Sequence, residues 1–348
     1  MDGRGTITTG RGLRRMLHLA IQFLSLAAVV AAAGVALARA ADAIAETTGL
    51  GRVLVGSIAL AAATSLPELS VDIAAVRAGH ADLAAGDLFG SSLMNLLILA
   101  GIDLCHRNGR KMLSREAASH ALSATLAIAL TGLAGCAVAT AGRIPGIEFL
   151  RVSGWSWAII VAYLLGARML FVDQRISARV APEATQEGGA SGWPLRRALA
   201  VFAAAASVLV IAGPRLAAVA DAIADRSGLG GTFVGTTLVA LTTSLPELVA
   251  SLAAMRLGAL DLAIGNALGS NAFNMILFVP LDIVHAGPFF QAVSPTHAVT
   301  AFAVVIATSV AVLGQLYHVE RRLPLIEPDA LLVILVIVGA LGLVFQLS

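Results

Sequence analysis

TSLPEL occurs twice in this chain, at Thr64–Leu69 and at Thr243–Leu248, and each copy lies inside a long apolar stretch. Proline removes a backbone hydrogen bond and clashes with the preceding turn, so each copy predicts a broken helix, with Pro67 and Pro246 as the helix breakers. A glutamate at membrane depth is costly and indicates a functional site. Two identical defects at matching places therefore predict a single site built from two broken helices.

The composition indicates a membrane protein. Of 348 residues, 58% are hydrophobic and only 13% are charged, and the mean hydropathy is +0.88. A soluble domain carries about a quarter charged residues. Apolar runs of about 20 residues, long enough to cross a bilayer, recur along the chain. We therefore expect an all-α polytopic membrane protein embedded in a lipid bilayer. The net charge of +2, with basic residues between apolar runs, argues against a nucleic-acid partner.

Ten apolar segments follow one another along the chain. They lie near residues 16–38, 53–76, 83–104, 117–140, 152–172, 196–218, 232–255, 261–284, 297–317 and 328–347. The first is longer than the apolar core of a signal peptide, so we interpret it as a retained span. A polar stretch divides the segments five and five. The sequence thus predicts an N-terminal five-helix repeat (1–172), a short cytoplasmic linker (173–195) and a C-terminal five-helix repeat (196–348).

The two halves are copies of each other. Gly34–Asp103 aligns with Gly213–Asp282 without a gap, and the matched positions include residues that simple Ala/Leu richness does not supply. An odd number of spans per half makes the second copy enter the membrane from the opposite side. The expected fold is therefore ten transmembrane helices as two inverted-topology repeats, an arrangement in which the binding site lies near the midplane.

Lysine and arginine favour the cytoplasmic side of a membrane. Most of the 23 Lys and Arg residues fall on the side that holds the central linker, although the basic N-terminal tail lies on the other side. We therefore predict that the linker faces the cytoplasm and both termini face outside, in a bacterial-type inner or plasma membrane.

Each TSLPEL copy groups oxygen atoms at one depth. Thr64, Ser65 and Glu68 are three or four residues apart and share one helix face, and Pro67 frees the carbonyl of Ala63. The second copy repeats the pattern with Thr243, Ser244, Pro246, Glu247 and the carbonyl of Thr242. Hard cations such as Ca²⁺ prefer about six to eight such oxygen ligands.

A polar stripe follows on the next span of each half. Asp87, Ser91 and Asn95 are spaced four residues apart, and Asn266, Ser270 and Asn274 match them. The pairs Gly86/Gly90 and Gly265/Gly269 allow close approach of two helix backbones, which would bring each stripe against a glutamate.

The halves differ at two acidic positions. Asp72 is replaced by Ser251 in the second copy, and by helical spacing it faces either the same cavity or the linker region. Asp87 stands where the second half has Asn266. It either adds a negative charge near the cavity or caps the start of its span and faces water.

The paired segments GSIALAAATSLPEL…GDLFGSSLMN and GTTLVALTTSLPEL…GNALGSNAFN resemble the two alpha repeats of the sodium/calcium exchanger family, within the cation/calcium antiporter group. The resemblance implies Ca²⁺ and Na⁺ as transported ions, alternating access and no further cofactor. Carried over by position, it implies these cation ligands: Ala61, Thr64, Ser65, Glu68, Ser91, Asn95, Ala240, Thr243, Ser244, Glu247, Ser270 and Asn274. Asp87 and Asn266 are possible additional ligands.

The predicted function is that of a secondary antiporter, not an enzyme, exchanging Ca²⁺ for Na⁺. One alternative is Ca²⁺/H⁺ exchange, in which Glu68 and Glu247 would carry protons. A less favoured one is an intramembrane hydrolase with two carboxylates as general acid and base. A passive channel is a further alternative, against which the inverted repeat argues.

Overall fold

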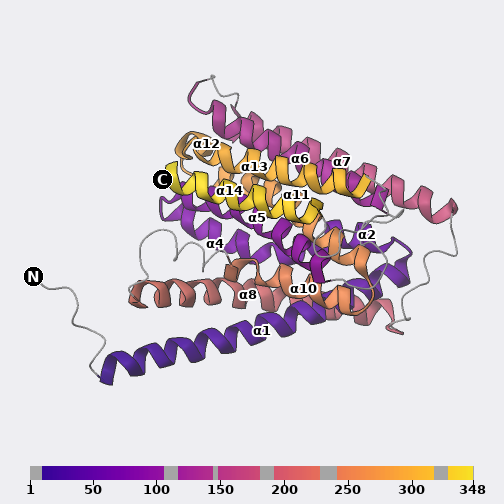
Figure 1. Ribbon diagram of the computed structural model, residues 1–348, viewed down its shortest axis with the longest axis horizontal. Coiled ribbons are helices and arrows are strands. Elements are labelled where there is room, and N and C mark those ends of the chain that lie inside the picture. The colour runs from indigo at the N-terminus through magenta and orange to yellow at the C-terminus, as the bar shows by residue number, and fades with distance from the viewer. Residues whose placement is uncertain are drawn as a thin grey trace, which may run out of the picture.

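The computed structural model describes residues 10–105, 117–143, 148–180, 192–227, 241–316 and 328–347. Most of these are helical, and the long helices run roughly along one axis (Figure 1). The elements in chain order are α1 (Gly10–Thr48), α2 (Arg52–Leu54), the π-helical segment η1 (Val55–Leu60), α3 (Ala61–Thr64), α4 (Leu66–Arg77), α5 (Ala81–Cys105), α6 (Ala117–Thr140), the hairpin strands β1 (Glu148–Phe149) and β2 (Val152–Ser153), α7 (Gly154–Val180), α8 (Leu195–Ser227), α10 (Leu245–Arg256), α11 (Leu260–Val284), α12 (Phe289–Ala292), α13 (His297–Leu316) and α14 (Pro328–Leu347).

The prediction of a helical polytopic membrane protein is confirmed. Among the described residues, seven helices are long and apolar enough to cross a membrane. A further candidate is the pair Arg52–Thr64 and Leu66–Arg77, which is bent by 40° and counts as an eighth span if the two helices are taken together. Of the other two predicted spans, one begins in residues 228–240, which lie outside the described ranges, and the other corresponds to α14.

Two predicted boundaries differ from the observed helices. Helix α1 extends to Thr48, well past the apolar run that ends at Ala38. Its last turns are held by Arg52, which pairs with Asp42 at 2.6 Å and Glu46 at 3.3 Å. Helix α7 continues to Val180, so the first part of the predicted linker, Asp173–Val180, is helical. That stretch contains no Gly or Pro, so nothing local ends the helix.

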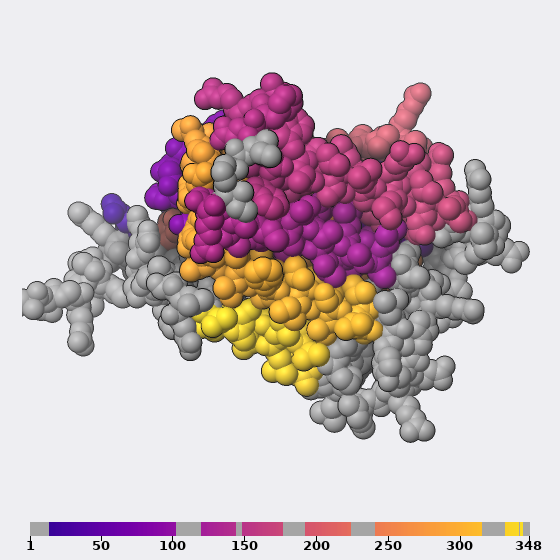
Figure 2. Space-filling model, turned by 90° about the horizontal axis from the view of Figure 1, so that it is seen from above, coloured from indigo at the N-terminus to yellow at the C-terminus, as the bar shows by residue number. Residues whose placement is uncertain are grey.

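Helices α5 and α11 occupy the centre of the molecule. About two thirds or more of their spanning windows are buried, 67% and 72%, compared with 17% for α1 and 28% for α8. Helix α1 packs along α8 and α10 on one side. On another side, α7, α6, α13 and α14 lie next to one another in that order (Figure 2).

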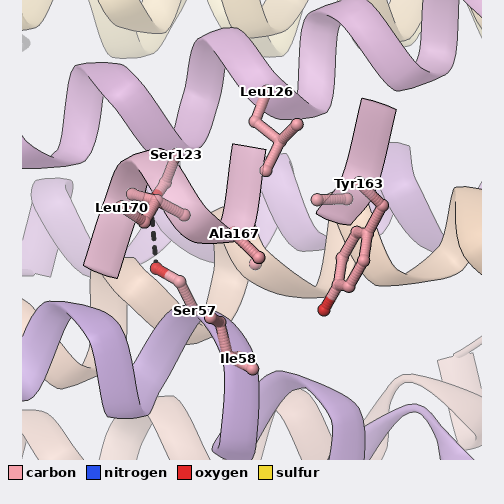
Figure 3. A pocket seen from close by; sticks show the side chains of 9 residues that line it. Ser57, Ile58, Ser123, Leu126, Tyr163, Ala167 and Leu170 are labelled. Atoms are coloured by element: carbon pink, nitrogen blue, oxygen red, sulfur yellow. Dashed lines mark hydrogen bonds between the residues drawn. The ribbon is translucent and has the colours of Figure 1, made fainter. Parts of the chain in front are cut away.

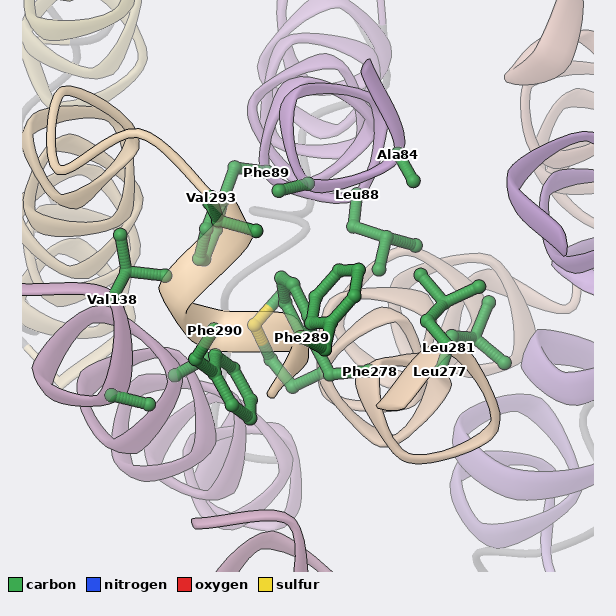
Figure 4. Packing of buried hydrophobic residues seen from close by; sticks show 14 of the residues in the cluster. Ala84, Leu88, Phe89, Val138, Leu277, Phe278, Leu281, Phe289, Phe290 and Val293 are labelled. Atoms are coloured by element: carbon green, nitrogen blue, oxygen red, sulfur yellow. The ribbon is translucent and has the colours of Figure 1, made fainter. Parts of the chain in front are cut away.

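The two central helices run antiparallel. Phe89, near the start of α5, packs against Phe278, near the end of α11, with ring centroids 5.2 Å apart and the rings tilted. At mid-helix, Asn95 donates to Asn271 at 3.1 Å. The short helix α12 inserts Phe289 and Phe290 beside Phe278 and closes an apolar cluster at this end (Figure 4).

A histidine of each half contacts an aspartate of the other half. His120 in α6 lies 2.9 Å from Asp261 at the start of α11. His297, the first residue of α13, lies 3.4 Å from Asp82 at the start of α5. Asp82 and Asp261 are matched positions of the duplication, so the two contacts are counterparts. They tie the ends of the halves together.

Close backbone approach is observed for one of the two glycine pairs. A Cβ on Gly269 would overlap the backbone of Ser57 in η1, and one on Gly265 would meet the carbonyl of Val53 at 3.0 Å. The prediction for Gly265/Gly269 is therefore confirmed. In the first pair, a Cβ on Gly86 would instead meet the ring of His297 at 3.1 Å. The segment of the second half that corresponds to η1 falls within residues 228–240, which lie outside the described ranges.

Candidate functional site

Both TSLPEL copies break a helix one residue before the Leu-Pro pair. In the first half α3 ends at Thr64 and α4 begins at Leu66, with Ser65 between them. In the second half residues 241–243 are helical, Ser244 is a turn, and α10 begins at Leu245. Proline is tolerated in a first helical turn because its missing N–H has no partner there anyway. The predicted breaks at Pro67 and Pro246 are confirmed.

The breaks place each glutamate in the first turn of a new helix. Glu68 lies in the first turn of α4 and Glu247 in that of α10. There the unpaired N–H groups and the helix dipole favour a negative charge. Each glutamate is only 1% exposed. One oxygen of each, Oε2, has no hydrogen-bond partner among the described residues.

Hydroxyl groups of each broken helix reach across to the other half. Ser65 donates to Glu247 Oε1 at 3.3 Å. The hydroxyl of Thr64 lies 3.3 Å from Asn266 Oδ1, while that of Thr243 donates to Asp87 Oδ1 at 3.4 Å. Every one of these contacts joins a TSLPEL residue of one half to a polar residue of the other. The site is therefore shared between the halves.

The polar stripes of α5 and α11 line the same centre. Ser244 donates to Ser91 at 3.5 Å, and the hydroxyls of Thr64 and Ser270 lie 3.5 Å apart. Asn95 Oδ1 and both polar atoms of Asn274 are buried without a partner among the described residues. Contacts across the halves thus join Ser65 to Glu247, Thr64 to Ser270 and Ser244 to Ser91. The other described ligand candidates, Ala61, Glu68, Asn95, Thr243 and Asn274, are buried. Ala240 lies outside the described residues, and the role of the set as cation ligands stays a prediction.

The sequence left open whether Asp72 faces the cavity or the linker region. In the structure Asp72 is buried inside the protein. It is 1% exposed, and its carboxyl group lies beside that of Asp87. Asp87 is not a water-facing cap, because its Oδ2 is buried and its Oδ1 accepts the bond from Thr243. Glu68 also lies within electrostatic range of both aspartates.

Two site residues were missed in the sequence. Ser251 accepts a hydrogen bond from Asn266 at 3.0 Å, and Asn271 accepts one from Asn95 at 3.1 Å. Asn271 is five residues after Asn266 and so falls off the four-residue stripe. Its orientation is set by the antiparallel neighbour α5, which a one-helix spacing rule does not include. For Ser251 the signal was its alignment with Asp72.

A small cavity lies beside η1. It is lined mainly by apolar groups of η1, α6, α7 and α11, and the Ser57–Ser123 contact of 2.9 Å lies at its wall (Figure 3). No acidic side chain lines it. The cation ligands are therefore not expected here.

The acidic residues form pairs. Within the described part of the chain, no three His, Cys, Asp or Glu side chains converge on one metal-sized position. Glu68 and Glu247 make one pair across the halves, and Asp72 and Asp87 make another within the first half. Carboxylate, hydroxyl and amide oxygens around each pair are the donors that hard cations prefer.

Comparisons with solved structures agree with this architecture. The sodium-calcium exchanger NCX_Mj, soaked with Na⁺ and Sr²⁺, superposes with a TM-score of 0.68 over 94% of this chain and 99% of that chain, at 18% sequence identity. This likeness concerns the fold.

Sequence comparisons extend it to the family. The inner membrane protein YrbG of Escherichia coli K12 is 27% identical over 247 residues, which cover 70% of this chain and 72% of that protein. The sodium/calcium exchanger MaX1 of Methanosarcina acetivorans is 43% identical over 74 residues, 19% of this chain and 21% of MaX1. The family model for the sodium/calcium exchanger protein matches residues 18–172 and 197–345. The chain therefore belongs to the sodium/calcium exchanger family of integral membrane proteins.

Proposed function

We propose that this protein is a secondary antiporter that exchanges Ca²⁺ for Na⁺ across the membrane by alternating access. The observation that carries the proposal is the pairing of Glu68 and Glu247 at two helix breaks. Each is buried, and each keeps one oxygen without a partner among the described residues. Membership in the family supports the identity of the ions.

The charge of this pair supplies a reason for exchange. Two carboxylates carry −2, which one Ca²⁺ or two Na⁺ neutralise. An uncompensated charge in a water-poor interior costs several kcal/mol, so the site changes sides readily only when it is loaded. Because Ca²⁺ and Na⁺ compete for the same oxygens, the return journey needs the other ion. Exchange follows from this competition.

We assign the remaining ligands by their positions around the glutamates. They are the hydroxyl groups of the two helix breaks, the polar residues of the two stripes and the backbone oxygens of the residues that precede the breaks: Ala61, Thr64, Ser65, Ser91, Asn95, Ala240, Thr243, Ser244, Ser270 and Asn274. Asn266 and Ser251 are assigned a positioning role, since their side chains hydrogen-bond each other.

The proposal includes the ten-helix inverted repeat. Antiparallel α5 and α11, matched helix breaks and the two reciprocal His–Asp contacts support an axis that lies in the membrane plane. Such an axis gives each half the same surroundings when viewed from opposite sides of the membrane. That equivalence is what alternating access requires.

Flux into proteoliposomes tests the function. Purified protein is reconstituted in vesicles loaded with Na⁺, and external ⁴⁵Ca²⁺ is added with an outward Na⁺ gradient or with an equivalent pH gradient. We expect Ca²⁺ uptake that depends on the Na⁺ gradient. Uptake driven by the pH gradient alone would replace Na⁺ with H⁺ as the coupling ion. Ca²⁺ leakage without either gradient would contradict exchange.

A double variant supplies the control. Glu68→Gln with Glu247→Gln keeps the side-chain volume and removes both charges. We expect it to insert and to elute as the parent does, while Na⁺-driven uptake is lost. Full uptake by this variant would exclude the glutamate pair as the site.

A further inference from the structure

A second pair of carboxyl groups lies one helical turn from the first. Asp72 follows Glu68 by four residues on α4, about 6 Å along the helix axis. Its carboxyl group lies beside that of Asp87 on α5. Asp72 is 1% exposed. Apart from the contact between the two carboxyl groups themselves, neither oxygen of Asp72, nor Asp87 Oδ2, has a hydrogen-bond partner among the described residues.

In the second half, the residues at the positions matched to Asp72 and Asp87 form a hydrogen bond with each other. Ser251 and Asn266 occupy the matched places, and Asn266 donates to Ser251 at 3.0 Å. The third member of each set is also conserved between the halves: the hydroxyl of Thr64 lies 3.3 Å from Asn266, as Thr243 lies 3.4 Å from Asp87. The threonine contact is therefore the same in both halves, while the chemistry of the pair differs.

Two ionised carboxyl groups cannot satisfy each other, because both only accept hydrogen bonds. None of the ion pairs among the described residues includes Asp72 or Asp87. Together with Glu68 and Glu247 they add up to four acidic groups, so one Ca²⁺ at the glutamates leaves this pair uncompensated. Buried like charges of this kind require a positive partner.

We infer that Asp72, Asp87 and the hydroxyl of Thr243 form a second cation site, for a divalent ion such as Ca²⁺, beside the glutamate pair. The charge of −2 matches one divalent ion, and the carboxylate and hydroxyl oxygens are its preferred donors. The identity of the ion rests on the proposed function. The existence of the site rests on the unpartnered oxygens.

The second site makes the two approaches to the glutamates unequal. Asp72 lies on the Arg77 side of Glu68, and Asp87 lies nearer the start of α5 than Ser91 does. A cation entering from this end meets the diacid first. From the opposite end it meets the neutral Ser251–Asn266 pair. The diacid is therefore a waiting position on one side of the exchange site only.

Equilibrium binding of ⁴⁵Ca²⁺ to the purified full-length chain in detergent, without Na⁺, tests the inference. The decisive variant is D72S/D87N, which copies the pair that the other half already accommodates. We expect two Ca²⁺ per parent chain, and one per D72S/D87N chain. E68Q/E247Q should also bind one, and the fourfold variant none. The single variant D87N provides a second, nearly isosteric test in which the second equivalent is lost or weakened.

Asp82→Asn is the matched control, because it removes an acid from the same end of α5 where the side chain is 59% exposed and pairs with His297. It should bind as the parent does. Equal Ca²⁺ stoichiometry and affinity for the parent and D72S/D87N would overturn the second site, and would mean that a shared proton balances the diacid. If D72S/D87N lost Ca²⁺ binding while E68Q/E247Q kept the binding of the parent, the glutamate pair would instead be overturned as the exchange site.

Discussion

Glu68 and Glu247 are equivalent by duplication, and each needs the other for a full charge of −2. Changing either one alone to Gln leaves a single carboxylate facing a divalent ion. Removing one partner of a buried charge interaction costs about 2–5 kcal/mol, so we expect the Ca²⁺ affinity to fall by about 30-fold or more. Isothermal titration of each single variant measures this. Parent affinity in either variant would restrict that glutamate to a packing role.

The hydroxyl groups around the glutamates should contribute less than the charges. Ser65 donates to Glu247 at 3.3 Å, so Ser65→Ala removes one neutral donor and one proposed ligand oxygen. A hydrogen bond of this kind is worth about 0.5–1.5 kcal/mol. We therefore expect the half-saturation concentration for Ca²⁺ to rise by about three- to tenfold with transport retained.

Ser123→Ala is the control for the hydroxyl change. It also removes a buried serine hydroxyl, but one that contacts Ser57 beside the apolar cavity. It should leave the half-saturation concentration unchanged. A rise as large as that of Ser65→Ala would mean that loss of any buried hydroxyl perturbs the site indirectly.

The residues of the site were largely predictable because they repeat. Both glutamates, their hydroxyl neighbours and both stripes follow from the matched segments and helical spacing alone. Asp72 could not be placed, because its spacing from Glu68 fixes only the face of α4 on which it lies, while its neighbour Asp87 comes from the next helix, α5. Asn271 could not be found because its partner, Asn95, comes from the other half.

At the scale of elements, the glycine contact between η1 and α11 controls how closely the halves approach. A Cβ on Gly269 would overlap the backbone of Ser57, which cannot move aside as a side chain can. Overpacking of this kind typically costs about 1–3 kcal/mol. We expect Gly269→Ala to lower the thermal unfolding temperature in detergent and to reduce transport.

Gly132→Ala in α6 is the matched control, since a Cβ there meets nothing within 4 Å. In an open helical position alanine is favoured over glycine by up to about 1 kcal/mol, so this variant should be as stable as the parent or more so. Equal unfolding temperatures for G269A and the parent would show that η1 and α11 can separate without loss.

Element boundaries were predicted best where sequence chemistry stops a helix. The breaks at Ser65 and Ser244 follow from proline and were found. The ends of α1 and α7 were placed too early, because hydropathy marks the end of an apolar run, while a helix continues through polar residues that favour it. The salt bridges from Arg52 show how such a polar extension is held.

At the scale of the whole molecule, the duplication makes a topological prediction that one pair of positions decides. Ala78 and Leu257 each follow the TSLPEL helix of their own half and are matched in the duplication, and both are exposed. An inverted repeat places them on opposite sides of the membrane. A parallel repeat would place them on the same side. The charge distribution predicts in addition that Ala78 faces outside and Leu257 faces the cytoplasm.

Labelling of single cysteines with a membrane-impermeant maleimide tests on which side of the membrane Ala78 and Leu257 lie. In a background with Cys105 and Cys136 changed to Ser, we expect Ala78→Cys to react in intact cells and Leu257→Cys to react only after permeabilisation. The opposite pattern would keep the inverted repeat and reverse the orientation. Reaction of both from one side would contradict the repeat, and with it alternating access, because two halves facing the same way cannot exchange roles across the membrane.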